Sequence, residues 1–350
     1  MRFGRKIYES VEGYTPGEQP REPGIIKLNT NENPYPPSPR VIEALQALTA
    51  DRARRYPDPL ASALCRACAG VYNLPGEDWL VAGNGMDELL ALALRAFVDP
   101  GDTVLALYPT YTLYEVLCQI HDCRLQYIEL NDEWLPPESF YKEKGRLCFL
   151  TRPNAPTGVA MPRADVERFC AQFPGIVVID EAYVDFCDDH CMDFPQRFDN
   201  VIVMRTFSKS YSLAGMRIGI AAAQPPLIRE FMKIKDSYNM NAWSQAAALA
   251  AVEDQAYMRS CAAKVRATRE RLREALIGLG FRVPPAQTNF LLARWEGSPS
   301  ASAIFEKLRR EHRILVRYFN YRRLDTALRI TIGTDEECDA LVDALSAILR

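Results

Sequence analysis

Short apolar stretches alternate with helix-like segments between residues 79 and 235. The apolar stretches are WLVAG, TVLALY, RLCFLT, GIVVID, NVIVMRT and RIGIAAA, and the helical patterns include MDELLALALRAF, TLYEVLCQI and RADVERFCAQF. Strands that alternate with helices build mostly parallel sheets with helices on both faces. The sequence therefore predicts an α/β fold, in which ligands bind at the carboxyl ends of the strands.

The segments on either side of this pattern differ from it. Residues 1–45 are rich in proline and glycine, so we expect them to form an extended segment that packs on the rest of the protein. We assign residues 46–243 to a large domain that contains the sheet. From about 244 to 277 the pattern predicts one long helix, and FRV, NFLLARW, ILVRYF and LRITIGT then alternate with two more helical patterns. Residues 244–350 are therefore expected to form a connecting helix and a small α+β domain.

The composition is that of an ordinary globular protein. The 350 residues carry a formal net charge of −3, which gives no electrostatic reason to expect nucleic acid or an acidic membrane as a partner. The chain shows neither an apolar leader region nor a run of about 18 apolar residues. We therefore expect a soluble, cytoplasmic protein that acts on small molecules.

The ten cysteines are expected to be reduced thiols rather than a disulfide framework. Cys65 and Cys68 have CxxC spacing, but they lie in a helical pattern that has no second such pair. Cys187, His190 and Cys191 could supply three zinc ligands, but no convincing fourth ligand follows nearby. We therefore predict no metal site.

Polar residues that can carry chemistry follow several predicted strands. Asp180 ends GIVVID, and a carboxylate at a strand's carboxyl end is costly unless it has a partner or a role. Lys209 lies between two serines just after NVIVMRT, and Asn154 lies in the Pro-flanked turn RPNAPTG after another strand. Since the strands are expected to be parallel, these groups should gather at one edge of the sheet.

A fourth signal is GNGMDELL, where a strand leads through Gly83, Asn84 and Gly85 directly into a helix. A helix N-terminus of this kind presents free N–H groups and the positive end of a dipole to an anion. The dinucleotide fingerprint lacks its third glycine and no GxxxxGK[ST] loop occurs, which favours a single phosphate. Arg217, with Ser208 and Thr206, could close around that phosphate.

A lysine, a carboxylate, a phosphate cradle and several aromatic residues are the parts that a pyridoxal phosphate enzyme needs. Lys209 would form the Schiff base and move a proton, and burial and nearby cations would keep its amine partly neutral. Asp180 would keep the pyridine nitrogen protonated. Tyr111, in YPTYTLY, would supply a face on which a flat ring can stack.

A set of motifs extends this reading over nearly the whole chain: KLNTNENPYPPSP, RYPDP, GNGMDELL, YPTY, RPNAPTG, IDEAYVDF, SKSYSLAGMRIG, QTNFLLAR and LRITIGT. In this order the sequence resembles the fold-type I pyridoxal phosphate aminotransferases, and within them the histidinol-phosphate aminotransferase branch. The resemblance implies a homodimer with shared active sites. It also implies ping-pong transfer of an amino group from L-histidinol phosphate to 2-oxoglutarate through a Schiff base on Lys209.

The resemblance assigns roles to individual positions. Lys209, Asp180 and Tyr183 would be catalytic, with Asn154 and Tyr183 hydrogen-bonded to the phenolic oxygen of the cofactor. Tyr56 would reach the phosphate of the other subunit's cofactor. The cofactor set as a whole would be Tyr56, Asn84, Gly85, Met86, Tyr111, Asn154, Asp180, Tyr183, Thr206, Ser208, Lys209 and Arg217. The substrate set would be Tyr14, Asn33, Arg317 and Arg329, with the arginines and Tyr14 matching the family's contacts to the substrate phosphate.

The sequence departs from the family pattern at two places. Tyr321-Arg322-Arg323 replaces the usual Pro-Gly turn, and we expect it to add charge near the phosphate pocket. Pro36 replaces the usual glycine after NENPY.

Three other functions remain open on the sequence alone. They are an aromatic amino acid aminotransferase, a pyridoxal phosphate-dependent decarboxylase of a phospho-amino acid, and a non-catalytic ligand-binding protein on the same scaffold. The presence of both Lys209 and Asp180 disfavours the last.

Overall fold

Within the described residues, 3–4, 6–9, 11–20 and 22–350, the computed structural model is centred on a seven-stranded sheet with strand order β2-β8-β7-β6-β5-β3-β4. β8 pairs antiparallel with β2 and β7, and the remaining pairs are parallel. The predicted mostly parallel α/β fold is thus confirmed. The strands are β2 Leu80–Gly83, β3 Thr103–Tyr108, β4 Arg124–Glu129, β5 Leu147–Thr151, β6 Ile176–Asp180, β7 Val201–Thr206 and β8 Gly219–Ala222.

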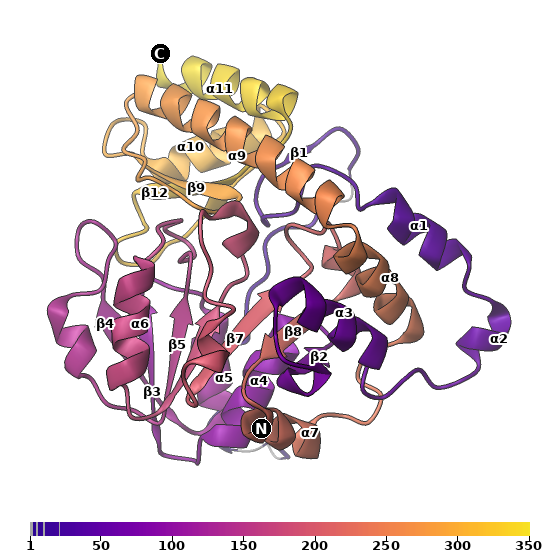
Figure 1. Ribbon diagram of the computed structural model, residues 1–350. Helices are drawn as coiled ribbons and strands as arrows, with labels where there is room; N and C mark the ends of the chain where they lie inside the picture. Colours follow the sequence, from indigo (N-terminus) through magenta and orange to yellow (C-terminus); the bar gives the residue numbers. More distant parts are fainter. Residues whose placement is uncertain (1–2, 5, 10, 21) are drawn as a thin grey trace.

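Helices cover both faces of this sheet (Figure 1). One face packs against α4 Met86–Phe97, α5 Leu113–His121 and α7 Pro225–Ile234. The other face packs against α3 Ser62–Tyr72, α6 Arg163–Gln172 and α8 Ala242–Glu253. Because both faces are covered, β2, β5 and β7 are buried along their whole length, which explains their continuous apolar runs. β4 lies at the edge and alternates between exposed and half-buried residues over most of its length.

A second, antiparallel sheet of three strands has the order β11-β12-β9. Its strands are β9 Phe290–Arg294, β11 Arg317–Tyr318 and β12 Ala327–Thr331. It packs with α9 Gln255–Gly278, α10 Ala301–Arg310 and α11 Asp335–Leu349 (Figure 1). Short 3-10 helices complete the chain: η1 Lys6–Glu9, η2 Glu77–Trp79, η3 Glu138–Lys142, η4 Val184–Phe186, η5 Phe194–Gln196 and η6 Ala214–Met216. No helix in the described part of the chain is long and apolar enough to cross a membrane.

The single helix predicted over 244–277 is wrong, because the structure has two helices, α8 and α9, with a break at Asp254. The Asp254 side chain caps α9 by accepting from the Tyr257 N–H at 3.4 Å, and it also accepts from Ser38 Oγ at 2.5 Å. No glycine or proline marks the break in the sequence. α8 packs against α1 and α3, beside the large sheet. We therefore propose that the chain divides at Asp254 rather than between residues 243 and 244.

We predicted an extended segment for residues 1–45, and its described part is extended only in places. β1 Ile26–Lys27 pairs in parallel with β10 Ile314–Leu315. Residues 39–45 are helical, because Ser38 caps α1 Pro39–Gln46 and proline stands at its first position. α1 packs against α8, and the segment with the following α2 Ala50–Ala53 stands out from the body of the molecule (Figure 1).

Candidate active site

A cavity opens at the carboxyl ends of the central strands, between the two sheets and the segment that follows β1. It brings together most of the residues singled out in the sequence. Those that line it are Tyr14, Met86, Tyr111, Asp180, Tyr183, Thr206, Ser208, Lys209, Arg217, Arg317 and Arg329. Asn33, Tyr56, Asn84, Gly85 and Asn154 are not part of its lining.

Lys209 lies in the loop after β7, with its amine inside the cavity. Its Nζ donates to the Thr30 carbonyl oxygen at 3.3 Å and lies 5.8 Å from the centre of the Tyr183 ring. Burial lowers the pKa of Lys209 to about 8, and the positive charges of Arg329 and Arg217 act in the same direction. A substantial fraction of this amine is therefore neutral near pH 8, as a nucleophile or proton acceptor requires.

Asp180 is the last residue of β6 and is only 2% exposed. Its Oδ2 accepts from the Tyr114 hydroxyl at 2.5 Å, and its Oδ1 accepts from the Ala182 N–H at 3.0 Å. Burial nevertheless raises the pKa of Asp180 to about 6. The contacts of this carboxylate come from neutral donors, so a cationic group from a ligand would favour its charged form.

Tyr114 was not identified from the sequence, although it lies only three residues after Tyr111. Its hydroxyl also bonds Thr151 Oγ1 at 2.8 Å, and its ring stacks on Phe149 with centroids 4.5 Å apart. The residue is fully buried in the first turn of α5. In the sequence Tyr114 looks like a core residue of an apolar helix, and nothing there indicates that its hydroxyl donates to Asp180.

The phosphate cradle predicted at the start of α4 is present in part. Gly85 has φ +85°, and a Cβ added to it would lie 2.6 Å from Arg217 Nη2, so this position requires glycine. The N–H groups of Asn84 and Gly85 are already engaged, by Glu88 Oε2 at 2.6 Å and by the Gly83 carbonyl at 2.8 Å. Anion binding at this helix therefore depends on Met86 and the residue after it, which line the cavity.

Three side chains converge opposite the start of α4. Arg217 donates from Nη1 to Ser208 Oγ at 3.4 Å, and Thr206 Oγ1 donates to the same oxygen at 3.0 Å. Arg217 Nη2 donates to Asp87 Oδ2 at 3.1 Å. Asp87 was not identified from the sequence, and it also accepts from the Tyr111 hydroxyl at 3.3 Å. One carboxylate thus holds an arginine and a tyrosine at the rim of the proposed phosphate site.

Asn154 lies buried next to the cavity rather than in its wall. Its Nδ2 donates to the Pro109 carbonyl and to Thr157 Oγ1, both at 3.0 Å, and its buried Oδ1 has no partner among the described residues. Tyr183 is held from the other side, because its hydroxyl accepts from Asn31 Nδ2 at 2.9 Å. The Oδ1 of Asn154 and the hydroxyl of Tyr183 can therefore each take part in a further hydrogen bond at the carboxyl ends of the strands.

Two arginines face each other in the smaller sheet, where Arg317 pairs in register with Arg329. Arg329 Nη2 donates to the Asn29 carbonyl at 2.8 Å, but its Nε is buried and has no partner in the described part of the chain. Burial lowers the pKa of Arg329. Among the described residues no carboxylate forms an ion pair with either arginine. Two guanidinium groups that line one cavity, neither of them paired with a described carboxylate, form a site for a doubly charged anion such as a phosphate.

Two residues of the predicted set lie elsewhere. Asn33 donates from Nδ2 to the Lys209 carbonyl at 3.0 Å and to the Ser210 carbonyl at 3.2 Å, so it braces the lysine loop. Tyr56 is 76% exposed on the projecting segment that contains α2, and its ring stacks on Tyr238 with centroids 4.3 Å apart.

We expected the triplet Tyr321-Arg322-Arg323 to add charge near the phosphate pocket, but it adds none to the lining of the cavity. Tyr321 lines the cavity, whereas the two arginines are absent from its lining. Arg322 forms an ion pair with Glu129, and Arg323 donates to the Leu130 carbonyl. The arginines turn away because these partners lie at the end of β4.

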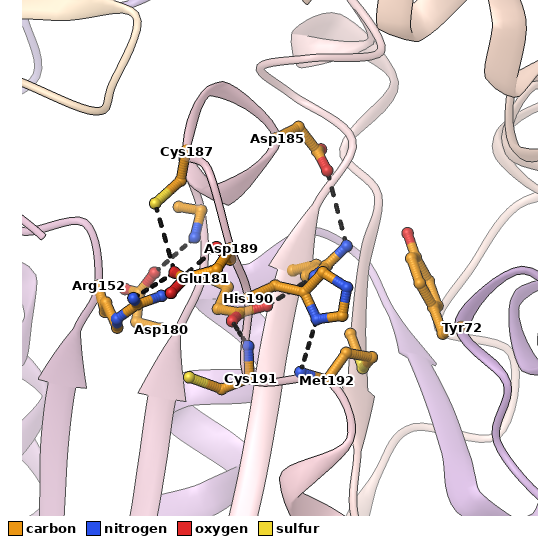
Figure 2. A network of polar contacts seen from close by, with 12 residues as sticks. Tyr72, Arg152, Asp180, Glu181, Asp185, Cys187, Asp189, His190, Cys191 and Met192 are labelled. Atoms are coloured by element: carbon orange, nitrogen blue, oxygen red, sulfur yellow. Dashed lines mark hydrogen bonds and ion pairs between the residues drawn. The ribbon is translucent and has the colours of Figure 1, made fainter. Parts of the chain in front are cut away.

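The loop that contains Cys187, His190 and Cys191 belongs to a polar network next to Asp180 (Figure 2). Cys187 Sγ donates to Gln287 Oε1 at 2.6 Å, and His190 Nδ1 accepts from the Met192 N–H at 3.3 Å. In the described part of the chain, no group of three His, Cys, Asp or Glu side chains is arranged to hold a metal ion. All ten cysteines are free thiols.

A buried ion pair connects this network to the lysine loop. Glu181 and Arg205 approach within 2.8 Å, with side chains 0% and 7% exposed. Arg205 also lies 3.6 Å from Asp185, which accepts a hydrogen bond from Ser210. Its guanidinium packs 4.7 Å from the centre of the Tyr72 ring (Figure 2 shows Glu181, Asp185 and Tyr72). The pair therefore links the residue after Asp180 to the residue after Lys209.

Comparison with known proteins confirms the resemblance seen in the sequence. Residues 23–345 match the family aminotransferase class I and II. The chain is 43% identical to histidinol-phosphate aminotransferase 1 of Trichormus variabilis, with 99% of both chains covered. It is 45% identical to histidinol-phosphate aminotransferase of Synechocystis sp., with 98% of this chain and 97% of the relative covered.

The fold has a counterpart among solved structures. The crystal structure of histidinol-phosphate aminotransferase from Sinorhizobium meliloti in complex with pyridoxal-5'-phosphate superposes with a TM-score of 0.90 at 26% sequence identity. The match covers 100% of this chain and 98% of that one. The chain therefore belongs to the class I and II aminotransferase family.

Proposed function

We propose that this protein is a pyridoxal phosphate-dependent aminotransferase that transfers the amino group of L-histidinol phosphate to 2-oxoglutarate. The observation that carries the proposal is one cavity that is lined by a lysine, a buried aspartate and two arginines that have no paired carboxylate among the described residues. Full-length relatives of 40–45% identity that are named for this activity support the same substrate.

The residues present fit the cofactor. The raised pKa of Asp180 marks a carboxyl that lacks a cation, and a protonated pyridine nitrogen would supply one. Thr206, Ser208 and Arg217 converge where the start of α4 can help to hold a phosphate. The unpartnered Oδ1 of Asn154 gives the site a free polar atom beside the strand ends.

When bound, the cofactor supplies an electrophilic aldehyde and a ring that accepts electrons. Asp180 would hold the ring nitrogen, and Tyr183 with Asn154 the phenolic oxygen, while Tyr111 would offer its face to the ring. Lys209 would bind the cofactor covalently. Its Nζ, with a pKa of about 8, can accept a proton from the substrate carbon and return one near neutral pH.

Arg317 and Arg329 would bind the phosphate of the amino donor, and Tyr14 lines the same wall of the cavity. The Tyr14 ring meets the Tyr111 ring edge to face, with centroids 5.6 Å apart. The same two arginines would take the carboxylates of 2-oxoglutarate in the second half-reaction. One anion site can thus serve both substrates, as a ping-pong reaction requires.

Two copies of the chain would form a homodimer with shared active sites. The projecting segment around α1 and α2 exposes Ile42 (44%), Tyr56 (76%) and Leu60 (52%), an unusual set of apolar side chains for a surface. In the dimer Tyr56 would reach the cofactor phosphate of the partner subunit. The ten free thiols are in keeping with a reducing compartment, so we place the enzyme in the cytoplasm.

An absorbance titration of the protein loaded with pyridoxal phosphate tests the function. The visible band should bleach at low concentrations of L-histidinol phosphate and respond far less to phenylalanine. A stronger response to phenylalanine would move the donor to aromatic amino acids, and release of carbon dioxide without an oxo-acid acceptor would indicate a decarboxylase. Lys209→Ala should abolish turnover, and a variant that still turns over would refute the mechanism.

A further inference from the structure

The turn between β11 and β12 forms part of the cavity wall and is also tied to the large sheet. Phe319, Tyr321 and Leu324 face the cavity. The two arginines that follow Tyr321 point in the opposite direction, onto the residues at the end of β4 and just after it. This turn therefore connects the substrate cavity with the contact between the two sheets.

Arg322 is anchored by three kinds of contact. Its guanidinium forms an ion pair with Glu129, the last residue of β4. It also lies 5.2 Å from the centre of the Tyr108 ring. The Tyr108 hydroxyl in turn donates to the Arg322 carbonyl oxygen at 3.0 Å, which fixes the backbone of the turn as well as the side chain.

Arg323 provides the second anchor. It donates to the carbonyls of Leu130 and Asn131, the latter at 2.9 Å, and its guanidinium lies 4.5 Å from the centre of the Trp134 ring. Trp134 is 5% exposed and also contacts Arg294 of β9. Arg323 has φ +69°, a left-handed conformation that a non-glycine residue keeps only when its surroundings hold it. The backbone of the turn is therefore determined by these anchors.

The anchored turn places an aromatic surface beside the two arginines of the anion site. Phe319 lies 5.3 Å from the Arg317 guanidinium and 5.5 Å from that of Arg329. Tyr321 continues this surface, because its ring stacks on Phe319 with centroids 6.2 Å apart and planes 27° apart. Tyr321 remains 50% exposed, so one side of its ring is available to a ligand.

We propose that Tyr321 is a specificity-determining residue that stacks on the planar ring of a phosphorylated amino donor, and that Arg322 and Arg323 are positioning residues that hold it there. The proposal rests on the function proposed above. A phosphate fixed by the two arginines brings the rest of the donor alongside Phe319 and Tyr321, where a flat heteroaromatic ring gains a stacking contact. Donors without a phosphate would not be held at this surface.

The test measures the dissociation constant of L-histidinol phosphate from its absorbance change, together with kcat and KM. Tyr321→Ala should weaken binding about tenfold and act mainly on KM, and Tyr321→Phe should restore it because the ring is retained. Removing both arginines, by Arg322→Ala with Arg323→Ala, should cause a similar loss. The KM for 2-oxoglutarate, which has no ring, should change less than about twofold.

A matched control and a combined variant separate positioning from a general loss of stability. Arg168→Ala removes an arginine that also pairs with a carboxylate, Glu138, and packs 4.0 Å from a tyrosine ring, but far from the cavity, so it should leave binding unchanged. If the arginines act through Tyr321, combining Tyr321→Ala with both arginine substitutions should add no further loss. Unchanged binding by Tyr321→Ala, or losses that add up, would overturn the proposal.

A second readout does not depend on the substrate. In the cofactor-free protein, Arg323→Ala should shift the tryptophan emission to longer wavelength, because Trp134 loses the guanidinium that covers it. Arg168→Ala should cause no shift. Wild-type protein that fails to react with L-histidinol phosphate would overturn the proposed function and the substrate role of Tyr321. An unchanged emission would separately overturn the positioning role of Arg323.

Discussion

Replacing Asp180 by asparagine should stabilise the cofactor-free protein while weakening its hold on the cofactor. Burial raises the pKa of Asp180 from 3.8 to about 6. One pKa unit corresponds to about 1.4 kcal/mol, so ionising this carboxyl in the folded state costs about 3 kcal/mol. Because the pKa of Asp180 is higher in the folded than in the unfolded state, this carboxyl contributes no penalty to folding below about pH 4, where it is protonated in both states. The penalty grows as the pH rises and is fully present above about pH 6. Asparagine cannot ionise, but its single carbonyl oxygen can accept from Tyr114 and not also from the Ala182 N–H, so the gain in stability is at most about 3 kcal/mol.

The assay is urea unfolding of cofactor-free protein, followed by circular dichroism. At pH 8 Asp180→Asn should be more stable than wild type by up to about 3 kcal/mol, and the difference should shrink to about 1 kcal/mol near pH 4.5. Asp343→Asn, an exposed position on α11, serves as the control and should show neither effect. An Asp180→Asn protein that is no more stable than wild type at pH 8 would refute the reasoning, since the carboxylate would then be compensated within the chain.

Three further predictions follow from the geometry of the site. The rate at which Lys209 binds pyridoxal phosphate covalently should rise with pH and reach half its maximum near pH 8, where the amine loses its proton. A midpoint near pH 10 would show that burial does not lower the pKa of this lysine. Glu181→Gln removes the nearer of the two carboxylates beside the buried Arg205 and leaves only Asp185, at 3.6 Å, so urea unfolding should show a loss of up to about 3 kcal/mol. Glu138→Gln, at an exposed pair, should change little. Arg329→Ala should raise the KM for L-histidinol phosphate roughly 10- to 100-fold, with the cofactor absorbance band intact, and an unchanged KM would place the phosphate elsewhere.

The strands of the large sheet and the location of the site followed from local pattern to different degrees, and the order of the strands was not predicted. The apolar runs that precede Asp180 and Lys209 predict buried parallel strands, and parallel strands end at a common edge, so the two residues had to lie near each other. β4 escaped prediction because an edge strand with one exposed face lacks a continuous apolar run. The break at Asp254 escaped it because a cap needs only a side chain that reaches the next turn, which a helix-like sequence does not reveal.

The sequence by itself determined the fold class and the cofactor chemistry, because these depend on periodicity and on motifs of fixed spacing, and it singled out Lys209 and Asp180 as the residues that we propose to react. Only the tertiary structure decided how those residues are tuned and enclosed. Tyr114 reaches Asp180 from α5, through a hydrogen bond between residues that are 66 positions apart in the chain. The direction of Arg322 depends on Glu129, at the end of a strand nearly two hundred residues earlier. Pairings over such distances depend on how the helices and the two sheets pack against one another, and no local pattern in the chain encodes them.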